Sequence, residues 1–247
     1  MRYLTADYIY PLNEPPIKNG VLQISDAGEV IDIHRDKINF QVEEIEVFKG
    51  IICPGFVNTH CHLELSHLKG MIPQRIGLLN FIKHINNRNK FNNGPIQECI
   101  HLAEQEMIKN GIVAVGDICN TKATIRQKKK RNLIYYNFIE VFEVNPININ
   151  SKITQALQIR DEFINSNFKA SITPHALYSN HPLLIKKILE VNGSDKDIFS
   201  IHNQESDLEN QLFELKKGKL FKWLKMINAD PDIWNKRAQN LDIINEL

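Results

Sequence analysis

Two histidines one residue apart, His60 and His62, follow an apolar run at residues 54–59. On a β-strand, residues i and i+2 point to the same face, so both imidazoles would point to one place while Cys61 faces away. Two neutral imidazoles at one point are the start of a metal site. The pair by itself also fits two histidines that fill a polar pocket at a strand end, so other residues must distinguish these readings.

From residue 56 onward, short apolar runs alternate with amphipathic helical patterns. We expect strands to begin near residues 56, 113, 133, 170 and 198. This alternation is typical of a parallel α/β sheet with right-handed crossovers. We expect the basic run Lys128-Lys129-Lys130-Arg131 to be the solvated end of a helix rather than a nucleic-acid patch, because no aromatic residues interleave it.

Two further histidines fall at the carboxyl ends of predicted strands, His175 on the fourth and His202 on the fifth. In α/β barrels the functional groups gather at that edge, so these residues could join His60 and His62. Glu205 lies three residues beyond His202, where a carboxylate could face an activated water and shuttle a proton. Its alternative role is a negative charge that favours the N-terminus of the next helix.

The N-terminal segment has a different pattern, with strand-like runs and no helical periodicity between them. Residues 2–12, 20–34 and 39–52 read as strands with turn residues between them, which indicates a β-meander or small sandwich. The Pro54-Gly55 pair marks a boundary. We therefore predict two parts, an N-terminal β-sandwich portion at 1–53 and a parallel α/β portion at 54–247.

Composition excludes several classes of protein. The chain has 247 residues, 43% of them hydrophobic and 24% charged, with a formal net charge of +1, as in ordinary soluble globular proteins. We expect no nucleic-acid partner, and no membrane span because no apolar run approaches about 20 residues. The four cysteines form no CxxC pair and no signal peptide precedes them, so we expect a cytoplasmic protein with reduced thiols.

Several segments, taken in order, resemble the amidohydrolase superfamily, in particular its cytosine/guanine deaminase-like and S-adenosylhomocysteine or methylthioadenosine deaminase-like branch. Residues 62–67 are also similar to chlorohydrolase and aminofutalosine deaminase relatives. The likeness runs through nearly the whole chain. The segments that carry it are residues 28–33, 54–62, 111–117, 174–179 and 202–205.

The resemblance implies a small β-sandwich beside a (β/α)8 TIM-type barrel that holds one divalent metal, Zn or alternatively Fe. It implies that His60, His62 and His202 ligate the metal, that Glu205 relays a proton as the catalytic residue, and that His175 lies beside the substrate. We add Glu64 and Glu140 as further candidate contacts to the substrate.

The superfamily also uses a histidine on strand six and an aspartate on strand eight, and neither is found here. We count about five barrel strands, so the fold class expected is an incomplete α/β barrel. We expect this chain to be the N-terminal part of a longer enzyme, with weak or no activity if it ends at Leu247.

The resemblance implies a metal-dependent hydrolase of non-peptide carbon–nitrogen bonds that deaminates a nucleobase or adenosine-type compound. One alternative keeps the fold but changes the reaction to dechlorination or amide hydrolysis, since the leaving group is chosen by loops. Another is a truncated, inactive metal-binding relative. The expected partner is a small-molecule substrate, and the sequence leaves its identity and a homo-oligomer open.

Overall fold

The computed structural model describes residues 1–36, 44–87, 95–192 and 198–233, and the chain divides into two compact units, Met1–Phe56 and Val57–Leu247. The positions of the two units relative to each other are not determined. Each unit is therefore described by itself.

The N-terminal unit contains two small sheets. The first has the order β5-β4-β1-β6, with β1 antiparallel to β4 and parallel to β6. The second has the order β3-β2-β7. The strands are β1 Arg2–Thr5, β2 Tyr8–Ile9, β3 Ile17–Lys18, β4 Val21–Ile24, β5 Val30–His34, β6 Ile45–Val47 and β7 Ile51–Ile52.

The strands in this unit are shorter than the ranges 2–12 and 39–52. Residues 2–12 are broken between β1 and β2. The turn expected between residues 21–24 and 30–33 lies between β4 and β5, where Gly28 takes a φ of 83° that a residue with a Cβ rarely adopts. Of the segment expected at 39–52, residues 39–43 lie outside the described residues. The packing of these sheets as a sandwich stays a prediction.

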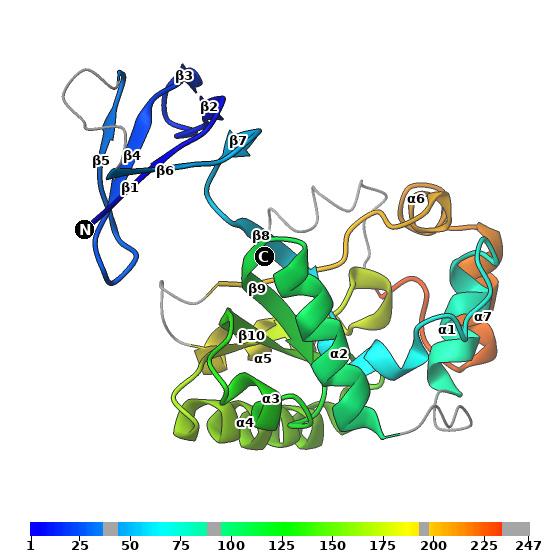
Figure 1. Ribbon diagram of the computed structural model, residues 1–247. Coiled ribbons are helices and arrows are strands. Elements are labelled where there is room, and N and C mark those ends of the chain that lie inside the picture. The colour runs from blue at the N-terminus through cyan, green and yellow to red at the C-terminus, as the bar shows by residue number, and fades with distance from the viewer. Residues whose placement is uncertain (37–43, 88–94, 193–197, 234–247) are drawn as a thin grey trace. The chain divides into compact units, whose positions relative to one another are not determined.

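The C-terminal unit is built on a parallel sheet with the order β11-β10-β9-β8 (Figure 1). Helices α2, α4 and α5 pack against it. The strands are β8 Phe56–Cys61, β9 Ile112–Cys119, β10 Ile134–Val141 and β11 Lys169–Pro174. The helices are η2 Leu63–Leu68, α1 Leu78–Asn86, α2 Ile96–Lys109, α3 Ile125–Lys128, η4 Pro146–Asn148, α4 Ile149–Asn165, η5 Leu177–Ser179, α5 Pro182–Asn192, α6 Asp207–Phe213 and α7 Gly218–Met226.

The core of this unit follows from near-continuous apolar strands facing amphipathic helices. Ile139 on β10 and Ile172 on β11 are fully buried against Phe163 of α4 and Leu184 and Ile188 of α5. A second apolar cluster joins η5 to α6 and α7 through residues such as Tyr178, Leu212 and Leu220. Within the described ranges, no helix combines the length and apolarity that crossing a bilayer requires.

The fifth strand, expected near residue 198, does not form a regular ladder. Residues 198–202 lie beside β11, but the only bridge that these residues make in the described chain joins His202 to Ala176, two residues beyond the end of β11. Side chains replace the missing backbone pairs: Ser171 Oγ donates to the Ile198 carbonyl at 2.6 Å, and the Ser200 amide donates to Thr173 Oγ1 at 2.8 Å. The expectation of five regular strands was therefore wrong for the described residues, because the hydroxyls of β11 occupy the partner's backbone groups.

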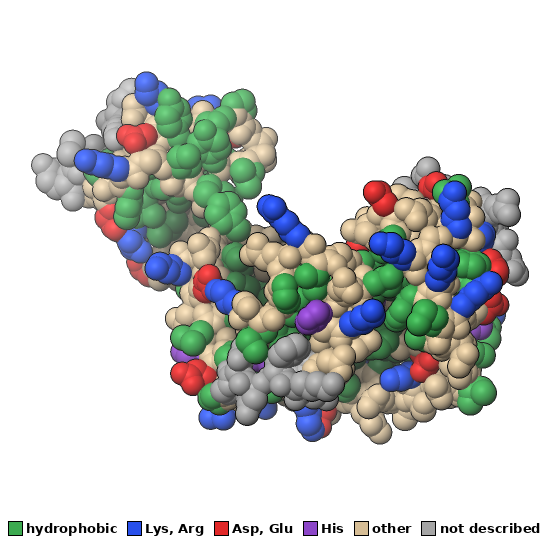
Figure 2. Space-filling view, turned by 90° about the vertical axis from the view of Figure 1, so that its right-hand side faces the viewer, with side chains coloured by type: hydrophobic (Ala, Val, Ile, Leu, Met, Phe, Trp, Pro, Cys, Tyr) green, Lys and Arg blue, Asp and Glu red, His purple; other side chains and the backbone are tan. Residues whose placement is uncertain are grey.

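The basic run at 128–131 meets the expectation in part: Lys129, Lys130 and Arg131 are exposed just after α3, but Lys128 is not. Helix α3 ends at Lys128, and this side chain is fully buried rather than solvated. Its ammonium lies 2.5 Å from Asp117 Oδ2, in an ion pair that is 0% exposed on both sides. Figure 2 shows other Lys and Arg side chains spread singly among apolar and acidic ones over the visible face. Lys128 can be buried because Asp117 on β9 supplies its counter-ion. The sequence around Lys128 does not show that this partner is present.

A candidate metal centre

The site begins where β8 ends. His60 is the penultimate residue of the strand, His62 follows its final residue, and the centroids of the two imidazole rings lie 5.0 Å apart. Cys61, between them, packs instead with the apolar cluster of Leu63 and Ile100. The alternation of a strand therefore directs the two imidazoles to one side, as the spacing predicts.

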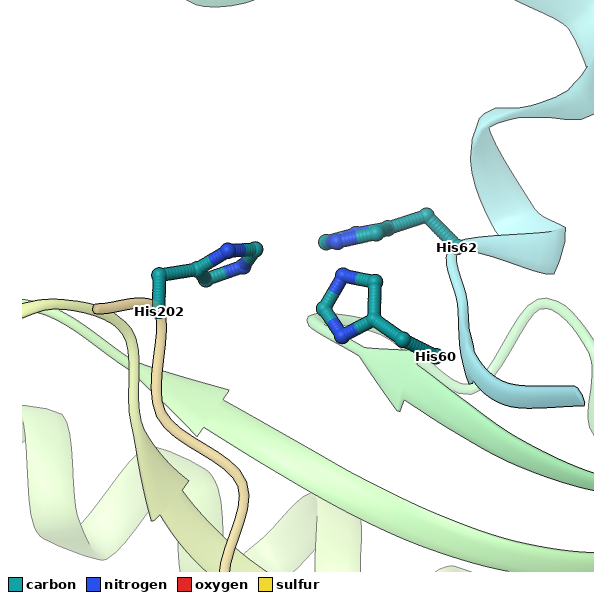
Figure 3. Close-up of side chains that lie close together, drawn as sticks. All are labelled: His60, His62 and His202. Carbon is teal, nitrogen blue, oxygen red and sulfur yellow. The ribbon is translucent and has the colours of Figure 1, made fainter. Parts of the chain in front are cut away.

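His202 completes a cluster of three imidazoles. Its ring centroid is 4.7 Å from that of His60 and 6.0 Å from that of His62. One ring nitrogen of each residue lies within 4.8 Å of the others. Figure 3 shows the three rings directed toward one another, two from the segment that ends β8 and one from the segment facing it. The His202 amide donates to the His175 carbonyl at 2.7 Å, which fixes its position beside β11.

Two nitrogens in this cluster make no hydrogen bond to the described residues. They are His62 Nδ1 and His202 Nε2, and both are buried. A buried polar atom without a hydrogen bond costs free energy, so native structures rarely leave one without a protein, water or metal partner. Neutral imidazole nitrogens are good ligands for Zn and Fe. The donor set therefore fits a divalent metal ion.

Glu205 orients the His202 ring from its other edge. Glu205 Oε1 lies 2.7 Å from His202 Nδ1, and Glu205 Oε2 accepts a hydrogen bond from the Tyr178 hydroxyl at 3.3 Å. The Glu205 amide donates to Glu209 Oε1 at 2.8 Å, which ties the residue to helix α6. A carboxylate on one imidazole nitrogen fixes the tautomer and leaves the other nitrogen for a metal.

His175 lies next to the cluster. Its ring centroid is 4.6 Å from that of His202, and its Nδ1 lies 2.8 Å from Ser179 Oγ. The Ser179 hydroxyl donates its proton to the Ala176 carbonyl at 3.0 Å. When the Ser179 hydroxyl donates to the Ala176 carbonyl, His175 Nδ1 carries the proton in its bond to Ser179, and Nε2 is the acceptor.

Glu140 has a more central place than the sequence indicated. It is 8% exposed at the carboxyl end of β10, with Oε1 3.6 Å from His202 Nε2 and Oε2 accepting from Asn120 Nδ2 at 3.2 Å. Glu140, His175 and His202 form a second group whose ligand atoms lie within 4.8 Å of one another. In the sequence, only the position of Glu140 at the end of a predicted parallel strand could indicate that it lies near the cluster.

Glu64 is occupied by bonds within the chain. Its carboxylate accepts hydrogen bonds from the Asn120 amide at 3.1 Å and from the Thr121 amide and hydroxyl at 3.0 and 2.7 Å. Burial raises the pKa of Glu64, and these bonds act in the opposite direction. The residue thus fastens the loop after β9, and its predicted contact with a substrate stays a prediction.

The charges around the cluster favour a cation. Glu140 and then Glu205 raise the pKa of His202 to about 9, although burial opposes this. At 3.6 Å, Glu140 acts on His202 by charge attraction rather than by a short hydrogen bond. Burial, together with the neighbouring imidazoles, lowers the pKa of His60 and of His62. Two carboxylates that stabilise a proton on His202 would also stabilise a metal ion in its place.

Comparison with known families gives a consistent picture. The model of the amidohydrolase family matches residues 51–223, which is most of the chain. Among curated relatives, aminodeoxyfutalosine deaminase of a Nitratiruptor species is 26% identical over 222 residues, covering 85% of this chain and 52% of the relative. The 5'-deoxyadenosine deaminase of Methanococcus vannielii is 26% identical over 193 residues, which cover 74% of this chain and 46% of the relative. The chain spans about half the length of these relatives.

Solved structures support the fold. Helicobacter pylori aminofutalosine deaminase in complex with methylthio-coformycin superposes with a TM-score of 0.76 at 18% identity, over 91% of this chain and 56% of that one. A mutant of atrazine chlorohydrolase from Arthrobacter aurescens, complexed with zinc and atraton, superposes with a TM-score of 0.67 at 13% identity, over 94% of this chain and 56% of that one. These structures share with this chain a fold of the TIM-barrel type; the described sheet of the C-terminal unit has four strands and is not a closed barrel.

Proposed function

This chain belongs to the amidohydrolase family. We propose that it acts as a metal-dependent hydrolase that removes an amino group from a nucleobase or adenosine-type compound. The observation that carries this proposal is the convergence of His60, His62 and His202, with Glu205 bonded to the outer nitrogen of His202. The relatives named as deaminases of 5'-deoxyadenosine and aminodeoxyfutalosine support the substrate class.

His60, His62 and His202 would hold the metal, with His202 offering Nε2. When bound, such an ion supplies Lewis-acid activation of water. Zinc is the first choice, since an atrazine chlorohydrolase of similar fold was crystallised with zinc, and iron is the alternative because imidazole suits both ions.

The chain's own residues account for proton handling. Glu205 is held against His202, and that hydrogen bond keeps the pKa of Glu205 below its ordinary value, although burial opposes this. The carboxylate is therefore ionised at neutral pH and can take a proton at Oε1 or Oε2 and return it to the departing amine.

His175 is suited to recognise the substrate. With the proton on Nδ1 held by Ser179, Nε2 can accept a hydrogen bond from the amino group of an adenine-type ring. Burial lowers the pKa of His175, although Glu140 opposes this, so the ring is neutral at neutral pH and keeps that acceptor.

Metal content tests the centre. We expect one zinc or iron ion per chain, lost in His60→Ala and His202→Ala, and retained in His84→Ala, which changes a histidine on α1 outside the cluster. Loss of metal from all three variants, or from none, would contradict the assignment. Ammonia release from adenosine-type and pyrimidine compounds, measured on the longest natural form of the protein, tests the reaction, and release without any metal dependence would contradict it.

A further inference from the structure

A buried ion pair links the strands behind the candidate metal centre. Lys128 Nζ lies 2.5 Å from Asp117 Oδ2 and donates to Asn137 Oδ1 at 2.6 Å. Asn137 stands directly opposite Asp117 in the register of β9 and β10, and its Nδ2 donates to the Lys169 carbonyl on β11 at 2.8 Å. The remaining oxygen, Asp117 Oδ1, accepts from the Leu63 amide at 2.8 Å. One polar network therefore spans β9, β10 and β11 and reaches the residue after His62.

Such a pair needs an explanation beyond stability. Both side chains are 0% exposed, and removing two charges from water costs several kcal/mol per ion, so buried ion pairs add little net stability. Burial disfavours the Lys128 ammonium, but the attraction of Asp117 outweighs it, and the pKa of Lys128 lies above its ordinary value. The Lys128 ammonium thus stays charged at neutral pH, and its contact at 2.5 Å holds Asp117 in a fixed orientation.

That orientation matters because Leu63 is the first residue of η2. The first amides of a helix have no partner within it, and the side chain of the N-cap residue commonly accepts from the second or third of them rather than from the first. The N-cap residue of η2 is His62, and its side chain makes no capping hydrogen bond. Asp117 supplies the acceptor for the Leu63 amide at the first position, and the His62 imidazole keeps Nδ1 without a hydrogen bond beside His60 and His202.

We propose that Asp117, held by Lys128, is a positioning residue for His62: from the neighbouring strand it anchors the Leu63 amide at the start of η2 and so fixes the backbone that directs the His62 imidazole toward His60 and His202. The inference rests on the proposed function, because it assumes that the three histidines bind a metal. Asp117 acts through the backbone of Leu63 and contacts no reacting atom.

Two double variants test the role of the anchor at Leu63 separately from that of the charge. Asp117→Asn with Lys128→Met removes both charges but retains an oxygen that can accept from Leu63, while the new amide can donate to Asn137 Oδ1. Asp117→Leu with Lys128→Met removes both charges and the acceptor at similar volume. Changing both partners together avoids leaving one buried charge unpaired, which would be strongly destabilising.

The measurement is the dissociation constant for zinc, by competition with a chelator, alongside thermal unfolding of the metal-free proteins. We expect the Asn variant to bind zinc within about threefold of the unaltered chain, and the Leu variant to bind about 10- to 100-fold more weakly, as when outer partners of metal ligands are lost. Equal affinities in the two variants would overturn the proposal.

Glu104→Gln is the matched control. Glu104 on α2 is also 0% exposed, and its carboxylate accepts from Gln127, Asn132 and Tyr135 but not from η2. We expect this variant to unfold at lower temperature with its zinc affinity unchanged. A parallel loss of zinc affinity here would show that affinity follows general stability, and would also overturn the positioning role.

A second measurement needs no variant. If the anchor at Leu63 and the metal favour the same arrangement of His62, zinc must also stabilise the bond at Leu63, because such coupling is reciprocal. We expect hydrogen exchange of the Leu63 amide to slow on addition of zinc, and an unchanged rate would contradict the proposal even if a double variant fails to fold. Failure of the unaltered chain to bind zinc or iron would instead refute the proposed metal centre itself.

Discussion

Zinc affinity should rise with pH in a way set by one histidine. The carboxylates of Glu140 and Glu205 raise the pKa of metal-free His202 to about 9, whereas the pKa values of His60 and His62 lie below their ordinary value of 6.5. At neutral pH, zinc therefore displaces a proton from His202 but meets His60 and His62 already neutral. Proton and metal compete for one nitrogen, so affinity increases as the proton leaves.

The size of the effect follows from the pKa. At about pH 7 roughly 1% of His202 is neutral, and at about pH 8.5 roughly 24% is neutral, so the apparent affinity should increase about 25-fold between these values. Zinc binding should release about one proton at pH 7 and about 0.8 at pH 8.5.

The assay is chelator competition at several pH values, corrected for titration of the chelator, with proton release measured by calorimetry in buffers of different ionisation enthalpy. Glu140→Gln removes the largest cause of the raised pKa, so its affinity should change less over the same range and its proton release at about pH 7 should decrease. Zinc affinity that is independent of pH in the unaltered chain, or release of several protons, would refute the reasoning.

Two further outcomes concern stability. Gly116→Ala should destabilise the protein by about 1–3 kcal/mol and weaken zinc binding, because the added Cβ would lie 2.6 Å from the carbonyl oxygen of Thr59, the residue before His60. Denaturant unfolding measures the change in stability. The control is Val113→Ala, at an exposed position of the same strand, whose free energy of unfolding should stay within about 0.5 kcal/mol of that of the unaltered chain. An equal effect of both substitutions would contradict the steric argument. The raised pKa of His202 favours the folded state fully below about pH 6.5, and this contribution is lost as pH rises through about 9. The unfolding temperature of the metal-free chain should therefore fall over that range and should fall less in His202→Gln; equal slopes would exclude His202 as the cause.

The sequence by itself was informative wherever function depended on local spacing. The i, i+2 separation of His60 and His62 and the strand that carries them predicted imidazoles on one side, and the structure has their rings 5.0 Å apart. The rule that parallel strands present their carboxyl ends at one edge placed His175 and His202 near them, and their ring centroids are 4.6 Å apart. The assignment of these residues as ligands and substrate contacts stays a prediction.

Tertiary structure decided the partners of the buried charges. Lys128 reads locally as part of a solvated basic run, yet Asp117 from another element makes it a core residue. Glu64 reads as a pocket residue, yet its oxygens are taken by the loop at 120–121. The sequence determined which side chains could do the chemistry, because their spacing along a strand is local. Only the fold determined which of them stay available, because desolvation and hydrogen-bond pairing depend on residues far apart in the chain.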